Sequence, residues 1–153
     1  MDAFTELLFL GKIVAAAFLG GLVGLEREFA QKPAGLRTHM LVCATSAFLV
    51  MLAVLMVSSF EPQNIINTDP IRLVEAIVVG ISFLGAGTII KHNRDRSVEG
   101  LTTSASILAV SAIGIAVALD AYILAVGVTI LNLIINWGVM YVANRAKSEL
   151  EQD

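Results

Sequence analysis

Long apolar segments constrain this sequence more than any other feature. A helix needs about 20 predominantly apolar residues to cross the hydrocarbon core of a bilayer, and five such segments fill most of the 153 residues. Hydrophobic residues make up 57% of the chain and charged residues only 15%. In soluble domains, apolar residues make up roughly half of the chain and charged residues about a quarter. The sequence therefore predicts an all-α integral membrane protein with five transmembrane helices, at residues 7–25, 36–57, 71–90, 101–119 and 121–143.

The connections between these segments are short, so we expect one transmembrane domain over residues 1–153 and no soluble C-terminal domain. The first segment follows the acidic residues Asp2 and Glu6, whereas a secretory signal peptide begins with positive charge. We therefore expect this segment to remain as a helix. The one cysteine, Cys43, has neither a disulfide partner nor zinc-ligand spacing. This composition argues against a nucleic-acid binder, a soluble enzyme or a secreted disulfide framework.

The distribution of basic residues predicts the orientation of the helices. Seven of the ten lysines and arginines lie between the first and second segments, between the third and fourth, or after the fifth, and an eighth, Arg37, lies at the start of the second segment. Basic loops stay in the cytoplasm by the positive-inside rule. The sequence therefore predicts an N-terminus outside and a C-terminus inside (N-out/C-in).

An internal repeat also emerges when the chain is shifted by 65 residues. Nine identical residues then fall within positions 18–47, and they place Gly20 on Gly85 and Gly35 on Gly100. The first two helices would then be equivalent to the third and fourth in a parallel repeat, related by an axis along the membrane normal. The alternative is a shared preference for small residues at helix contacts.

The turn between the first two segments gathers charged and polar residues. Glu26 and Arg37 fall at the membrane edge of neighbouring antiparallel helices, where a charge is costly unless it is paired, so we predict a Glu26–Arg37 ion pair. The alternative is a cation or partner site built on Glu26 and Glu28. We expect Thr38 to cap the second helix, and His39 to form hydrogen bonds at the interface rather than to ligate a metal.

The outer side shows a second charged group before and inside the third segment. Asp69 is placed to cap that helix, and Arg72 and Glu75 are three residues apart, so they can pair on one helix face. A carboxylate one turn inside an apolar segment is a functional candidate, which makes Glu75 one. Lys12 in the first segment is expected to extend its amine outward to the interface.

The fourth segment is rich in hydroxyl groups, including that of Thr102. Such hydroxyls bond to their own helix or to a neighbour, and the alternative is a hydroxyl-lined path for an ion. Magnesium prefers carboxylates and retained waters, and no carboxylate lies deep in the first, second, fourth or fifth segment. Glu26 and Glu75 are thus weak metal candidates, and we expect no cofactor, with Mg²⁺ as the one ion to consider.

Several sequence blocks, taken together and in order, resemble those of the MgtC/SapB family of membrane proteins. These blocks are Gly24-Leu25-Glu26-Arg27-Glu28, residues 32–42, 83–90 and 100–103, and Ala112-Ile113-Gly114. The resemblance covers about residues 15–120. It implies a five-helix protein of the bacterial inner membrane, associated with magnesium limitation, acid tolerance and intracellular survival. The best-studied branch acts as a regulator that binds other membrane proteins, including the ATP synthase.

The resemblance also marks particular positions. The family's charged or functionally sensitive positions match Glu26, Arg27, Arg37, Asp69, Arg72 and Thr102. The virulence-factor branch carries Asn where this chain has Thr102, and a Trp-Cys pair where it has Leu108-Ala109. That branch also adds a cytoplasmic domain resembling an ACT fold, which we do not expect here.

The predicted function is magnesium or stress homeostasis through the binding and regulation of other membrane proteins. We expect a homo-oligomer in contact with membrane lipid, with a dimer favoured, and no enzyme, because no nucleophile, base and orienting acid stand together. The docking face would consist of the charged residues of the cytoplasmic turns: Glu26, Arg27, Glu28, Lys32, Lys91, Arg94, Asp95, Arg96 and Glu99. The alternative function is a small cation (Mg²⁺) transporter or channel.

Overall fold

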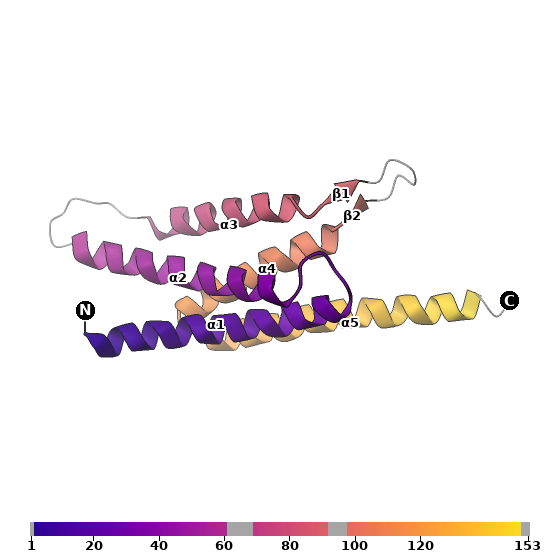
Figure 1. The fold of residues 1–153 in the computed structure, drawn as a ribbon. Helices are drawn as coiled ribbons and strands as arrows, with labels where there is room; N and C mark the ends of the chain where they lie inside the picture. Colours follow the sequence, from indigo (N-terminus) through magenta and orange to yellow (C-terminus); the bar gives the residue numbers. More distant parts are fainter. Residues whose placement is uncertain (1, 61–68, 92–97, 151–153) are drawn as a thin grey trace.

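The computed structural model describes residues 2–60, 69–91 and 98–150, with the side chains of the last helix described to Gly138. Within these ranges the chain forms five helices, which confirms the predicted all-helical fold. They are α1 (Ala3–Phe29), α2 (Leu36–Phe60), α3 (Pro70–Ala86), α4 (Leu101–Ala118) and α5 (Tyr122–Leu150). Successive helices run in opposite directions, so the two chain ends lie at opposite ends of the bundle (Figure 1).

Three of these helices are long and apolar enough to cross a membrane: Ala3–Phe29, Leu36–Val57 and Leu101–Ala118. The α3 helix has 17 residues, which is close to the lower limit of about 17 for a spanning helix. The apolar part of α5 that the structure describes, Tyr122–Gly138, is also short. The first, second and fourth predicted spans thus have helices that fit a membrane protein.

The α1, α2 and α4 helices pack closely through small residues. A Cβ atom at Gly20 of α1 would lie 2.6 Å from the His39 carbonyl oxygen and from the Cys43 Cβ of α2. A Cβ at Gly114 of α4 would overlap the Cys43 carbonyl oxygen. Without side chains at these glycines, three backbones approach one another, as small residues permit in membrane helix packing. The largest fully buried aliphatic side chains are those of Val23, Ile107, Val110, Ile113 and Val117.

The α3 helix lies at the periphery of this bundle, packed mainly on α4 (Figure 1). Its start follows the prediction, because the Asp69 side chain accepts a hydrogen bond of 2.9 Å from the Ile71 backbone N–H. Pro70 occupies the first helical turn, where its missing N–H is not needed.

The end of α3 differs from the prediction. The helix ends at Ala86 rather than at residue 90, and Ile90–Lys91 (β1) pairs antiparallel with Val98–Glu99 (β2). Gly100 follows with a φ angle of +88°, and a Cβ there would overlap the Thr88 carbonyl oxygen. A glycine is therefore required where this hairpin joins α4. Apolar residues continue past Ala86, which explains why the sequence predicted a helix up to residue 90.

Candidate functional site

A buried ion pair lies near the end of α1. Glu26 and Arg27 are 6% and 3% exposed, and the Arg27 Nε and Nη2 atoms donate to the two Glu26 carboxylate oxygens at 2.5 and 2.6 Å. The predicted Glu26–Arg37 bridge is therefore wrong. Arg37 is exposed, and the neighbouring residue on α1 occupies both carboxylate oxygens of Glu26.

Glu28 connects α1 to the start of α2. Its Oε2 atom accepts a hydrogen bond of 2.8 Å from the Leu36 backbone N–H. The N-terminus of a helix has unpaired N–H groups and favours negative charge, so this contact stabilises the turn. The predicted Thr38 cap is wrong, because α2 begins two residues earlier. Gly35 permits the contact, since a Cβ there would overlap the Glu28 carboxylate.

His39 lies inside the bundle with no exposed surface. Its Nδ1 is 2.8 Å from the Gly35 carbonyl oxygen, and its Nε2 is 2.9 Å from the Ser106 hydroxyl oxygen of α4. A carbonyl can only accept, so Nδ1 carries the proton; in a neutral ring, Nε2 then accepts from Ser106. The predicted hydrogen-bonding role is confirmed, although His39 is buried between helices. The ring also interacts electrostatically with Arg27 and Glu26.

A second polar contact lies farther along the α2–α4 interface. The hydroxyl groups of Ser46 and Ser111 are buried and 2.8 Å apart. We call His39, Ser46, Ser106 and Ser111 the α2–α4 seam. No buried side-chain nitrogen or oxygen in the described part of the chain lacks a hydrogen-bond partner. The seam therefore joins two helices through satisfied polar groups.

Sequence reasoning missed this seam, although two signals pointed to it. Ser46 and Ser111 are aligned by the 65-residue shift, and His39 and Ser46 are seven residues apart, which places them on one helix face. Thr102, chosen by resemblance, is exposed, whereas its neighbour Thr103 is buried.

The charged residues of α3 do not join the buried pair. Asp69 caps α3 at the end of the bundle opposite to the α1–α2 turn (Figure 1). Arg72 and Glu75 are both exposed. Among the side chains of residues 2–57, 69, 71–90 and 98–138, the ion pairs are Lys12–Asp120 and Glu26–Arg27, so the predicted Arg72–Glu75 pair is wrong.

Lys12 reaches the connection between α4 and α5. Its Nζ atom lies 2.7 Å from Asp120 Oδ2, and the Tyr122 hydroxyl donates to Asp120 Oδ1 at 2.8 Å. The hydrogen bond from Lys12, and to a smaller extent the one from Tyr122, lowers the pKa of Asp120 below its ordinary value. The Lys12 amine thus reaches the connection between α4 and α5, and its place at a membrane interface stays a prediction. Asp120 itself was not selected from the sequence.

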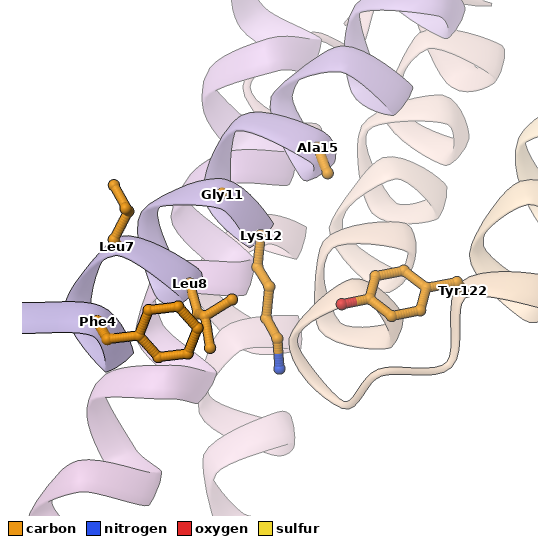
Figure 2. A pocket seen from close by; sticks show the side chains of 7 residues that line it. All are labelled: Phe4, Leu7, Leu8, Gly11, Lys12, Ala15 and Tyr122. Carbon is orange, nitrogen blue, oxygen red and sulfur yellow. The ribbon is translucent and has the colours of Figure 1, made fainter.

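The two metal candidates stay apart in the structure. The oxygens of Glu26 are occupied by Arg27, whereas Glu75 is exposed on the peripheral helix. In the segments that the structure describes, no group of three or more His, Cys, Asp or Glu residues is placed to hold a metal ion. A pocket of about 280 Å³ opens between α1 and the start of α5 (Figure 2), and neither candidate lines it.

Comparison with known proteins places this bundle in a family. The profile of the MgtC family matches residues 13–145. The chain belongs to the MgtC family. This membership confirms the resemblance to MgtC/SapB proteins, and together with the apolar helices it supports a multi-pass membrane protein.

Three relatives illustrate the similarity. Protein SapB of Bacillus subtilis is 36% identical over 105 residues, covering 69% of this chain and 45% of the relative. The Escherichia coli K12 protein named "Putative magnesium transporter YhiD" is 32% identical over 127 residues, covering 83% and 58%. Protein MgtC of Brucella abortus is 38% identical over 103 residues, covering 67% and 39%. The chain thus spans about half the length of these relatives, and no solved structure matches it.

Proposed function

We propose that this MgtC-family chain serves magnesium or stress homeostasis in the bacterial inner membrane by binding and regulating other membrane proteins, and that it is not an enzyme. One observation carries the proposal: the buried carboxylate of Glu26 has both oxygens occupied by Arg27. An ion entering the bundle would have to displace that guanidinium. The name of the E. coli relative supports the link to magnesium.

The proposed docking surface is the end of the bundle that carries the α1–α2 turn. Its exposed charged residues are Glu28, Lys32, Arg37 and Glu99, which we call the turn face. Glu26 and Arg27 are buried and cannot contact a partner, which corrects the larger surface expected from the sequence. The side chain of Lys91 and residues 92–97 lie outside the described part.

The proposed orientation is N-out/C-in, with the turn face in the cytoplasm. The α1–α2 turn and the β1–β2 strands lie at the same end of the bundle (Figure 1), so Lys32 and Arg37 share one side with these strands. Cysteines at Lys32 and Asp2 test this directly, since both positions are exposed and the native Cys43 is buried. Labelling of Asp2→Cys but not of Lys32→Cys by an impermeant reagent is expected; the reverse pattern overturns the orientation.

The proposed parallel repeat of α1–α2 and α3–α4 is supported by equivalent contacts. A Cβ at Gly20 would meet His39, and a Cβ at Gly85 would meet Ser104. Both pairs are related by the 65-residue shift. We also propose a homodimer, in which the exposed Arg72 and Glu75 can pair between copies.

A complementation experiment tests the regulatory function. A bacterial strain that lacks this gene is grown in limiting magnesium and supplied with the wild-type protein or a variant. The double variant Lys32→Glu/Arg37→Glu reverses charge on the turn face and is expected to lose complementation while still inserting in the membrane. Asp2→Lys, a charge reversal at the opposite end, is the matched control and should complement. Full complementation by the double variant would contradict regulation through this surface.

The second candidate function is a small cation transporter. It is favoured by the name of the E. coli relative and by the hydroxyl groups of the α2–α4 seam, which could line a path between helices. A conducting protein needs a continuous series of polar sites that bind an ion weakly enough to release it. In this structure the seam hydroxyls already bond to His39 and to one another.

A further inference from the structure

The pocket between α1 and α5 combines an apolar wall with a polar mouth. It is lined by Phe4, Leu7, Leu8, Gly11, Lys12, Ala15 and Tyr122. The charged member is Lys12, and the Tyr122 hydroxyl points toward it (Figure 2). None of these residues belongs to the buried ion pair, the seam or the turn face.

The apolar part of the pocket is open enough to hold a hydrocarbon chain. Phe4 and Leu7 are 71% and 65% exposed, and a Cβ built at Gly11 meets no atom within 4 Å. In a membrane protein such a surface is covered by lipid chains, because no water is present to solvate it.

The two polar side chains that line the pocket, Lys12 and Tyr122, both bond to the carboxylate of Asp120. Lys12 Nζ lies 2.7 Å from Asp120 Oδ2, and the side chains are 18% and 62% exposed. An ammonium group has three donors and a carboxylate has about four acceptor sites. Asp120 accepts from Lys12 and Tyr122, so acceptor sites remain on the carboxylate. Lys12 also donates to the Ala118 carbonyl oxygen at 3.5 Å, so one of its three donors remains for a ligand.

We propose that this pocket binds a phospholipid with a primary ammonium headgroup, with one acyl chain against α1, its phosphate accepting from Lys12 and its ammonium donating to Asp120. This zwitterion complements both members of the Lys12–Asp120 pair. A purely anionic headgroup would place an unmatched negative charge beside Asp120. A choline headgroup has no N–H to donate to that carboxylate. The proposal depends on the membrane location of the family and not on the regulatory function.

Native mass spectrometry of the purified full chain in detergent tests the headgroup preference without any substitution. The protein is titrated with phosphatidylethanolamine, phosphatidylcholine and phosphatidylglycerol that carry identical acyl chains. We expect phosphatidylethanolamine to bind about tenfold more tightly than the other two lipids, because one additional hydrogen bond to a charged group increases affinity by about that factor. Equal binding of the three lipids, or tightest binding of phosphatidylglycerol, would overturn the proposal.

Two variants then locate the site. Gly11→Phe fills the open wall and should reduce phosphatidylethanolamine binding to the level of phosphatidylcholine. Gly80→Phe on α3 is the matched control, since a Cβ there also meets no atom within 4 Å, and it should bind as the wild type does. The double variant Lys12→Met/Asp120→Asn should lose the headgroup preference. If Gly11→Phe retains the preference, the lipid binds elsewhere and this assignment is wrong.

Discussion

The two helical hairpins of the chain, α1–α2 and α3–α4, share sequence features, but the helices of the first hairpin pack more tightly than those of the second. Gly20 and Gly24 of α1 press against backbone atoms of α2, with built Cβ distances of 2.6 Å to the His39 carbonyl oxygen and 2.8 Å to Leu36 Cα. On α3, a Cβ at Gly85 meets first the side-chain oxygen of Ser104, and one at Gly80 meets nothing. Small residues therefore permit close packing, but the contact also depends on what the partner helix presents.

The same contrast holds for charged residues. On α1, Glu26 and Arg27 are buried and form a hydrogen-bonded ion pair. On α3, Arg72 and Glu75 are exposed. A buried pair stabilises the fold only while both partners are present. The charges of α3 make no such contact within the described chain, so they are available to another molecule.

The largest expected effect comes from breaking the buried pair. Glu26→Gln or Arg27→Gln alone should lower the free energy of unfolding by about 3–5 kcal/mol, because each leaves an uncompensated buried charge. The double variant should recover part of this loss. Arg72→Gln and Glu75→Gln are controls on α3 and should change the free energy of unfolding of the monomer, in dilute detergent solution, by less than about 0.5 kcal/mol. Denaturant unfolding in detergent measures all five; equal losses on α1 and α3 would refute the contrast.

Alanine at equivalent glycines compares the two hairpins directly. Gly20→Ala should cost about 3 kcal/mol, because the new methyl group meets backbone atoms of α2 that cannot move separately. Gly85→Ala should cost less than about 1 kcal/mol, since the Ser104 hydroxyl can rotate away. Gly80→Ala is the unhindered control and should be neutral or slightly stabilising. If thermal unfolding shows similar losses for Gly20→Ala and Gly85→Ala, the hairpins are equally tight.

Removing one hydroxyl of the seam should have a smaller effect. Ser106→Ala takes the hydrogen-bond donor from His39 Nε2 and should lower stability by about 1–2 kcal/mol, the cost of a buried polar group without a partner. Ser82→Ala on α3 is the control, because Ser82 is exposed. A neutral result for Ser106→Ala in the same unfolding measurement would mean that the hydrogen bond does not hold α2 to α4.

The smallest effect concerns the exposed Lys12–Asp120 pair. Its hydrogen bonds lower the pKa of Asp120 below the ordinary value of 3.8. The stabilisation is therefore complete above that value and is lost as the pH falls through the lower pKa of the folded state. Wild type should unfold at a slightly higher temperature than Lys12→Met at pH 7, and the difference should shrink below about pH 4. A difference that grows as the pH falls would contradict the direction of this pKa change.

The sequence was sufficient to predict the five helices, because each contains a long apolar segment. Asp69 and Pro70 placed the start of α3 correctly. The contacts between polar side chains could not be predicted in the same way. Thr102 and Thr103 differ by one position, yet about 100° of rotation separates them on a helix, and only the packing of α4 decides which is buried.

The ion pairs show the same limit in another form. The signs of the charges and their depth in the membrane suggested an ion pair between Glu26 and Arg37. These properties do not specify the direction of a side chain. In the structure, the carboxylate of Glu26 is bound by Arg27, the next residue in the chain. The β1–β2 hairpin was also missed, because two-residue strands leave no periodic pattern in the sequence.

Magnesium flux through the isolated protein tests the central claim, that paired polar groups hold the bundle together and do not conduct ions. The purified chain is placed alone in liposomes that contain a magnesium-sensitive dye, and a magnesium gradient is applied. We expect no uptake above that of empty liposomes, because Glu26 is occupied by Arg27 and the seam hydroxyls are bonded within the chain. Saturable, gradient-driven uptake by the wild type that is lost in Glu75→Gln would contradict this account and establish the transporter function instead.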